Sequence, residues 1–546
     1  MPAVHSHIRL ELSAARSPLV DSAAAVFRRQ VQERSGARVS VGGEGTFTVT
    51  LAPAGGIGRE GFRIEDDPTG GVRIVASDDR GLLYGVGKFL RTSRYAEDGF
   101  TPGAWRGTSV PVKPVRGIYF ASHFHNFYHD APVEEVGRYV QDLALWGTNA
   151  LMVWFDMHHF HGIDDPAAQA MLDRLAAMLK AAKDVGMGAG IGLLANEAYA
   201  NSPEELRADP ETGRAHYHVE LCPSKPGAKE RMLGWFAGQF DAFRSRGVEI
   251  DQLWVWPYDQ GGCACARCAP WGANGLLVMA EAISRLARTR FADVKTILST
   301  WLFDWREPQG EWEGLARAFE KPPDWLDYIL ADSHEDFPAY PLTHDVPGGL
   351  PLLNFPEISM WGMWPWGGLG ANPLPKRFQR LWEQVGDRVA GGFPYSEGIY
   401  EDINKAVLSR FYWDPQSSAR ETVREYAAFE FSPEVADDVV RAVEILEANH
   451  RYCRRRETRG EKPIEPRPDM EDAGAAEAFA LLEKTDAQLT ERARTAWRWR
   501  VLYLRGLIDR ERFSNEGVPT GACDDAFDEL TRIYHAANAE PQVHPP

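Results

Sequence analysis

The sequence lacks a long apolar run, a surplus of basic residues and a signal-peptide pattern, and each absence excludes a class of protein. No run of about 18 apolar residues occurs, so no segment is expected to span a membrane. Lys and Arg number 60 against 78 Asp and Glu, and the net charge of −18 argues against nucleic acid or an anionic membrane as a partner. The first thirty residues show no basic start followed by an apolar core, so no signal peptide is expected.

Cysteines are also few, with six in 546 residues. Three of them, Cys263, Cys265 and Cys268, fall within a stretch of six residues, which is not the spacing of a secreted disulfide framework. We therefore expect a cytoplasmic protein with reduced thiols. Neither a G-x-G-x-x-G motif nor a P-loop occurs, so no organic cofactor is expected.

The pattern of apolar residues changes twice along the chain and predicts three domains. Residues 1–112 mix short strands with two helices, at 17–36 and 80–95, and predict a small α+β domain. Residues 416–546 show only helical patterns, one of them continuous over 473–513, around a charged, proline-rich loop and before a disordered tail. Between them, residues 113–415 repeat a strand followed by a helix.

The repeated units number eight, although the sixth has only a short, proline-rich connection in place of a clear helix. This predicts an α/β fold, a (β/α)8 TIM barrel between an N-terminal α+β domain and an all-α C-terminal domain. A doubly wound open sheet is the second choice. The eight expected strands are 116–120, 149–155, 187–195, 252–256, 294–301, 325–332, 350–355 and 389–396.

Carboxylates follow several of these strands, at the end of the barrel where catalytic residues lie. Cleavage of a glycosidic bond needs one carboxylic acid and a second carboxylate as base or nucleophile. Asp259 is predicted as the acid or as an anchor for the terminal sugar, and Glu357 as its partner. Glu197 and Glu397 are the next candidates for acid and base. Burial among indoles would raise the pKa of such an acid.

Aromatic and polar side chains at the same strand ends are candidates for binding a sugar. Indoles stack on the apolar face of a sugar ring, and polar groups bind its hydroxyls. The predicted substrate-binding residues are His123, His125, Asp156, His158, Asn196, Tyr258, Trp301, Asp332, Trp361, Trp364 and Tyr395.

The histidines support a different hypothesis, a metal-dependent hydrolase or isomerase. Six of the 15 histidines fall between residues 123 and 161, and the pair His123 and His125 follows the first barrel strand as in metal-dependent amidohydrolases. That plan also needs a histidine or lysine on the fifth strand, where only Trp301 and Asp304 are found, although His334 follows the sixth.

The C-x-C-x-x-C motif offers three ligands for a structural zinc ion, which takes four. Cys222 is the expected fourth ligand, with His216 and His218 as substitutes. Reduced thiols without a metal are the alternative.

Two segments, SDDRGLLYGVGKFLR (77–91) and KPVRGIYF (113–120), resemble the α-glucuronidase and β-hexosaminidase group of barrel glycoside hydrolases. A third, YDQGGCACARC (258–268), is similar to an Asp-Gly-Gly-x-Cys-x-Cys-x-x-Cys element of related barrel families. The resemblance implies a non-catalytic, hexosaminidase-like N-terminal domain before the barrel and a helical domain after it. β-Hexosaminidases carry an adjacent Asp-Glu pair after strand 4, whereas Gln260 follows Asp259 here. α-Glucuronidases carry a glutamate acid there, which Asp259 matches in location but not in type.

The sequence thus predicts a cytoplasmic, exo-acting glycoside hydrolase that cleaves small oligosaccharides or glycosides. A barrel hydrolase or isomerase that uses a metal, and a carbohydrate-binding protein that has lost catalysis, are the alternatives. The sugar, the linkage and the oligomeric state stay open, a homodimer included.

Overall fold

The computed structural model describes most of the chain: residues 3–13, 15–122, 126–209, 219–258, 261–305, 308–333, 336–358, 372–449, 474–515, 518 and 520–536. Several predicted features lie outside the described residues, among them the loop 457–472 and the C-terminal tail. The predicted site residues outside them are Asp259, His123, His125, Trp361 and Trp364.

The N-terminal region forms a six-stranded sheet that carries two helices. The strand order is β2-β1-β3-β5-β4-β8, and neighbours pair in parallel except those on either side of β4. The strands are β1 (His7–Leu12), β2 (Arg38–Val41), β3 (Phe47–Pro53), β4 (Phe62–Asp66), β5 (Val72–Ala76) and β8 (Gly107–Ser109). The helices are α1 (Pro18–Arg34) and α2 (Asp79–Arg91), which begin at the side-chain caps Ser17 and Asp78.

The second helix is shorter than the sequence predicts. It ends at Arg91, and the following residues form the hairpin β6 (Arg94–Ala96) and β7 (Gly99–Thr101), so the expected helix over 80–95 is wrong at its end. The hydroxyl of Thr92 donates to the carbonyl of Lys88 at 3.0 Å, and that of Ser93 to Phe89 at 2.7 Å. Both bonds satisfy carbonyls in the last turn and terminate the helix.

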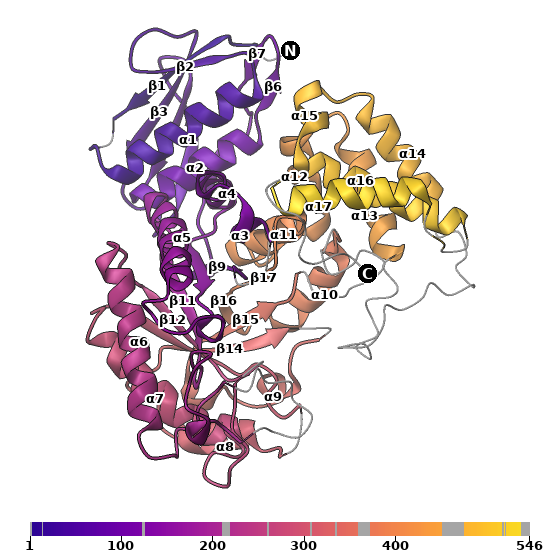
Figure 1. Cartoon of the computed structure of the whole chain (residues 1–546). Helices are drawn as coiled ribbons and strands as arrows, with labels where there is room; N and C mark the ends of the chain where they lie inside the picture. The colour runs from indigo at the N-terminus through magenta and orange to yellow at the C-terminus, as the bar shows by residue number, and fades with distance from the viewer. Residues whose placement is uncertain are drawn as a thin grey trace.

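The middle of the chain is a closed barrel of eight parallel strands, as predicted (Figure 1). Strand β10 pairs with both β11 and β9, which closes the sheet. The eighth strand consists of two segments that both pair with β9. The strands are β9 (Val115–Phe120), β10 (Ala150–Trp154), β11 (Gly188–Leu194), β12 (Gln252–Trp256), β13 (Lys295–Ser299), β14 (Tyr328–Ser333), β15 (Leu352–Pro356), β16 (Val389–Gly392) and β17 (Tyr395–Ser396).

Aromatic rings fill the inside of the barrel. Trp254 stacks on Trp256 with ring centroids 5.6 Å apart, and Trp256 lies 5.4 Å from Trp301. Gly192 on β11 makes room for a further ring, the indole of Trp154 on β10, because a Cβ atom at Gly192 would lie 2.5 Å from that indole. Part of the high tryptophan content therefore builds the core, because strands covered on both faces are apolar throughout.

Helices surround the barrel, and the sixth connection is as short as expected. The helices are α3 (Phe127–Asp130), α4 (Val133–Leu145), α5 (Pro166–Asp184), α6 (Ala228–Ser245), α7 (Gly275–Arg288), α8 (Glu311–Ala318), α9 (Ala339–Thr343), α10 (Pro375–Val385) and α11 (Asp402–Trp413).

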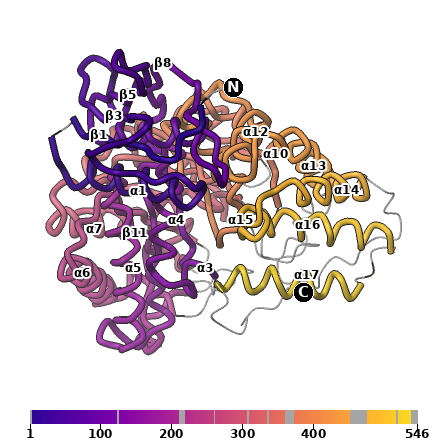
Figure 2. The backbone as a smooth tube through the Cα atoms, turned by 90° about the horizontal axis from the view of Figure 1, so that it is seen from above, coloured from indigo at the N-terminus to yellow at the C-terminus, as the bar shows by residue number. Residues whose placement is uncertain are grey.

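The C-terminal region is helical, with the predicted pattern over 473–513 divided into three helices. The helices are α12 (Ala419–Glu430), α13 (Ala436–Asn449), α14 (Ala475–Asp486), α15 (Glu491–Thr495), α16 (Trp497–Ser514) and α17 (Gly521–Tyr534). Figures 1 and 2 place α14, α16 and α17 on the side of the molecule away from α5, α6 and α7. Within the described residues, every helix is too short or too polar to cross a membrane.

Candidate active site

The candidate site lies at the carboxyl ends of adjacent barrel strands. Strand order places β17, β9, β10 and β11 side by side. Their ends carry Glu397, Tyr119, Asp156 with His158, and Glu197, in that order. The barrel topology therefore collects three of the predicted carboxylates and one predicted histidine along one arc of the mouth.

Asp156, His158 and Glu197 form a buried cluster. A short 3-10 turn, Met157–His159, follows β10 and directs His158 toward the end of β11. The Nδ1 atom of His158 lies 2.8 Å from Oδ1 of Asp156 and 3.4 Å from Oε1 of Glu197. The Glu197 side chain is almost fully buried, and its Oε2 atom has no hydrogen-bond partner within the described part of the chain.

The electrostatics of this cluster favour a protonated Glu197 at neutral pH. Burial, reinforced by the Asp156 carboxylate, raises the pKa of Glu197 to about 8, although the imidazole of His158 acts in the opposite direction. Burial would lower the pKa of His158, but hydrogen bonds with Asp156 and Glu197 outweigh it and raise that pKa to about 10. At neutral pH these shifts favour an imidazolium between a carboxylate and a neutral carboxylic acid.

A second pair of carboxylates, Glu357 and Glu397, lies beside Tyr395, on the other side of Tyr119 in the strand order. The hydroxyl of Tyr395 donates to Oε1 of Glu397 at 2.6 Å, and Glu357 forms a backbone bridge to Tyr395. Burial and the nearby charges of Asp156, Glu397 and Glu197 raise the pKa of Tyr119 well above its usual value. Carboxylates on both sides of Tyr119 along the arc therefore act on its hydroxyl group.

A cavity of about 340 Å³ opens beside Asp156. Its wall includes the indole of Trp154, the imidazoles of His129 and His159, and Arg174. This volume falls at the lower end of the range for small-molecule sites, about 300–1,000 Å³. The cavity thus has an aromatic wall and polar groups, and it lies next to the cluster of Asp156, His158 and Glu197.

Two predicted substrate-binding residues make hydrogen bonds to the protein itself. The hydroxyl of Tyr258 donates to Oε1 of Glu311 at 2.6 Å. The amide of Asn196 donates to the carbonyls of Leu221 and Gly262, at 3.0 and 2.9 Å, and accepts from the Gly262 N–H at 3.0 Å. The Asn196 bonds join the loops after β11 and β12.

The other predicted residues lie at separate places around the mouth. Trp301 packs between Trp256 and Phe355 at the end of β13, and Asp332 lies half-buried on β14. Tyr119 was missed by the sequence reasoning. The alternation of strand β9 carries the signal, because Tyr119, the residue before the last of the strand, lies on the opposite face from Arg116 and Ile118.

The histidine hypothesis has partial geometric support. Ligand atoms of Asp156, His158 and His159 lie within 4.8 Å of one another. Asp304, the polar residue after the fifth strand, instead accepts from the backbone N–H groups of Gly310 and Glu311 at the start of α8, at 2.6 and 2.8 Å.

No protein-family model and no curated protein matches this sequence. The similarity is structural. The fold matches that of a family GH115 4-O-methyl-α-glucuronidase with specificity for decorated arabinogalactans, with a TM-score of 0.64 and 12% identity over 98% of this chain and 77% of that one. A family GH138 enzyme targeting pectin rhamnogalacturonan II matches with a TM-score of 0.59 and 10% identity, over 96% and 90% of the two chains.

A family GH20 β-N-acetylhexosaminidase from Streptomyces coelicolor A3(2) matches with a TM-score of 0.53 and 16% identity, over 79% of this chain and 93% of that one. At these identities the matches establish the fold. They confirm the predicted structural resemblance to α-glucuronidases and β-hexosaminidases.

Proposed function

We propose that this protein is an exo-acting glycoside hydrolase that cleaves small oligosaccharides or glycosides with two carboxyl groups. The fold is shared with named glycoside hydrolases of three families, each with its own substrate. Function belongs to the site rather than the fold, so the proposal depends on the chemistry at the barrel mouth.

The observation that carries the proposal is the buried carboxyl group of Glu197 beside Asp156 and His158. A general acid must hold its proton at working pH and release it to the leaving oxygen. The pKa of about 8 meets the first need, and the buried imidazolium of His158 can stabilise the carboxylate left after proton transfer. Glu197 is therefore assigned as the acid, ahead of Asp259, which keeps the role of a sugar anchor.

Glu397 and Glu357 are the candidates for the second carboxylate. Both follow strands on the far side of Tyr119 and Tyr395 from Glu197. As nucleophile, one of them would bond to the anomeric carbon as the glycosidic C–O bond breaks; as base, it would take a proton from the attacking water. The hydrogen bond from Tyr395 holds Glu397 in place and favours it.

The cavity beside Asp156 is the proposed subsite for a terminal sugar. Its volume of about 340 Å³ suits one terminal unit better than a run of several, which is why the proposal is an exo-acting enzyme. Trp154, His159 and Arg174 line this cavity and are the side chains that a bound sugar would contact.

The test compares activated and unactivated leaving groups. A panel of 4-nitrophenyl glycosides and uronides identifies a cleaved sugar, and the alkyl glycoside of that sugar is then assayed. Glu197→Gln should lower kcat on the alkyl glycoside by about 10²–10⁴-fold, because an alkoxide needs a proton to leave, and far less on the 4-nitrophenyl glycoside.

The matched control is Glu204→Gln, an exposed glutamate in the same connection, which should retain activity. An equal loss on both substrates in Glu197→Gln would show that Glu197 is not the acid. Binding of sugars without cleavage of any substrate in the panel would favour the carbohydrate-binding alternative. The configuration of the first product, read by proton NMR, separates retention from inversion.

A metal-dependent hydrolase is the second candidate, supported by the closeness of Asp156, His158 and His159. Metal analysis separates the two. If the variants His123→Ala and His125→Ala lose bound metal together with activity, the metal-dependent reaction is correct.

A further inference from the structure

We propose that four cysteines bind one zinc ion, which fastens the loop after β12 to the loop after β11. The ligands are Cys222, Cys263, Cys265 and Cys268. The metal site depends only on these side chains. A second consequence, that the ion positions Glu197, rests on the proposed function.

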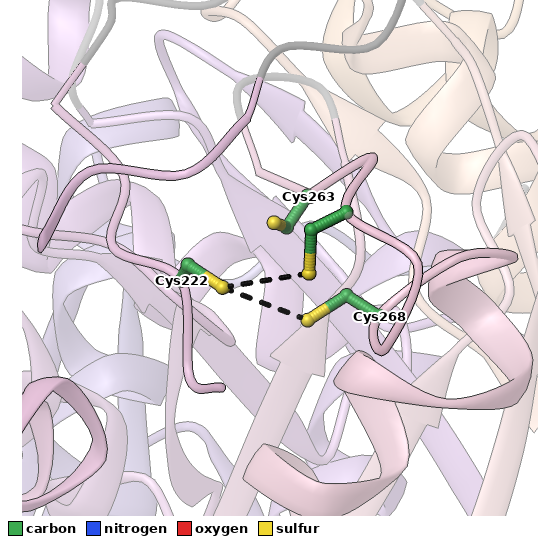
Figure 3. A group of neighbouring side chains, drawn as sticks. Cys222, Cys263 and Cys268 are labelled. Carbon is green, nitrogen blue, oxygen red and sulfur yellow. Dashed lines mark hydrogen bonds between the residues drawn. The ribbon is translucent and has the colours of Figure 1, made fainter. Parts of the chain in front are cut away.

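The sulfur atoms already have the spacing of a tetrahedral site. Cys222 Sγ lies 3.7 Å from Cys265 Sγ and 3.8 Å from Cys268 Sγ, and all four sulfurs lie within 4.8 Å of one another. A tetrahedral zinc ion with Zn–S bonds of about 2.3 Å separates its sulfurs by about 3.8 Å. Figure 3 shows the sulfurs of Cys222, Cys263 and Cys268 gathered between two segments of chain.

These contacts are not disulfides, because a sulfur–sulfur bond is about 2.05 Å long. All four cysteines are free thiols, and three are buried while Cys265 is partly exposed. Four protein sulfurs leave no open position, so the site is structural rather than catalytic.

Hydrogen bonds outside the four sulfurs hold the loops that carry them. The backbone N–H groups of Cys268 and Ala269 donate to the Cys265 carbonyl, at 2.9 and 3.0 Å, and close the turn that brings two of the ligands together. The Ser224 hydroxyl, two residues after Cys222, lies 3.0 Å from Cys268 Sγ. Contacts of this kind orient metal ligands.

A direct chain of bonds connects two of the ligands to Glu197. Leu221, next to Cys222, donates its N–H to the Asn196 carbonyl at 3.0 Å. Gly262, next to Cys263, exchanges two hydrogen bonds with the Asn196 side chain. Glu197 is the next residue after Asn196. The zinc ion would thus hold the backbone that carries the buried acid, and Asn196 is a positioning residue.

Metal analysis of the purified protein tests the site. Protein expressed with zinc and dialysed against metal-free buffer should hold one zinc ion per chain by mass spectrometry. X-ray absorption should give four sulfur neighbours at about 2.3 Å. Cobalt substitution should give the sulfur-to-metal charge-transfer absorption of a tetrahedral thiolate site.

The variant Cys265→Ser is the mildest change, because Cys265 is the most exposed ligand, and it should lose the zinc. Cys523→Ala is the matched control, since this buried cysteine lies on α17 outside the cluster, and it should keep the zinc. Zinc lost equally from both variants, iron in place of zinc, or protein that takes up neither zinc nor cobalt would each overturn the proposal.

The positioning role has a measurement that needs no substrate. Removal of zinc by a chelator should increase hydrogen exchange at the amides of Leu221 and Gly262, and zinc added back should reverse it. Unchanged exchange in zinc-free protein would disprove positioning while leaving the site intact. Where a substrate is known, water entering the loosened site should shift the alkaline limb of kcat toward lower pH, because the pKa of Glu197 falls as its burial is lost.

Discussion

Glu197 differs from the other glutamates because of what surrounds it. Burial removes water that would stabilise its anion, and the Asp156 carboxylate adds a repulsion that also favours the neutral acid. His158 partly offsets both effects and remains charged between them. The residue type alone carries none of this information.

His158→Gln should move the alkaline limb of the kcat profile to higher pH. The imidazolium lowers the pKa of Glu197, so its removal leaves burial and Asp156 unopposed and raises that pKa above about 8. Activity needs the protonated acid and therefore persists to higher pH. Steady-state kinetics over a pH series measures the shift. His161→Gln, an exposed histidine in the same loop, should leave the limb in place, and a downward shift in His158→Gln would contradict the assignment.

At the scale of elements, carboxylates fix the start of α8. Gly310 precedes this helix and has no side chain to cap it, so Asp304 accepts from the N–H groups of Gly310, Glu311 and Trp312. The Glu311 carboxylate in turn accepts from Tyr258 and from the Asp304 N–H. These bonds connect the loops after β12 and β13 at the edge of the barrel mouth.

Asp304→Ala should lower the free energy of unfolding by about 1–2 kcal/mol, the cost of losing a helix cap. Urea denaturation followed by circular dichroism measures the change, with Asp293→Ala, an exposed aspartate, as the control. Unchanged stability together with loss of a bound metal would instead favour the metal-dependent reaction.

The barrel strands were predictable because their burial on both faces produces apolar runs, such as Leu253 to Trp256. The end of α2 was not predictable, because Thr92 and Ser93 stop the helix through side-chain bonds that an amphipathic pattern does not record.

The cysteine cluster was predictable from spacing alone for three members. Cys222 was expected as the fourth member, and the parallel pairing of β11 and β12 brings the loops that carry the four cysteines together.

At the scale of the whole molecule, ion pairs join the three regions of the chain. Glu425 on α12 lies 2.9 Å from Arg91 and 3.1 Å from Lys88, both on α2. Arg498 on α16 lies 2.7 Å from Asp402 and 3.1 Å from Asp142 on the barrel helices α11 and α4. The last helix also reaches the site, since the hydroxyl of Tyr534 donates to the carbonyl of Glu397 at 2.9 Å.

Glu425→Gln should destabilise the fold at neutral pH by about 3 kcal/mol. Burial would raise the pKa of Glu425, but Arg91 and Lys88 outweigh it and lower that pKa from 4.5 to about 2. The stabilisation is therefore complete above pH 4.5 and is lost as pH falls toward about 2.

Urea midpoints at neutral pH and in acid measure both effects. The variant should lose stability at neutral pH and show a flatter decline in acid. Glu421→Gln, one turn earlier on the same helix and exposed, should behave like the wild type. A variant that declines in acid as steeply as the wild type would show that Glu425 does not carry this stability.

The sequence by itself determined the barrel, the helical end of the chain and the set of candidate carboxylates. Apolar periodicity is a property of each segment, and the order of the segments along the chain is given by the sequence. Only the tertiary structure decided the surroundings of each candidate carboxylate. The pKa of Glu197 depends on Asp156 and His158 from another strand, and the bonds of Asn196 and Tyr258 depend on neighbouring loops. Burial and charge at a point are sums over the whole surroundings, which no single segment of sequence contains.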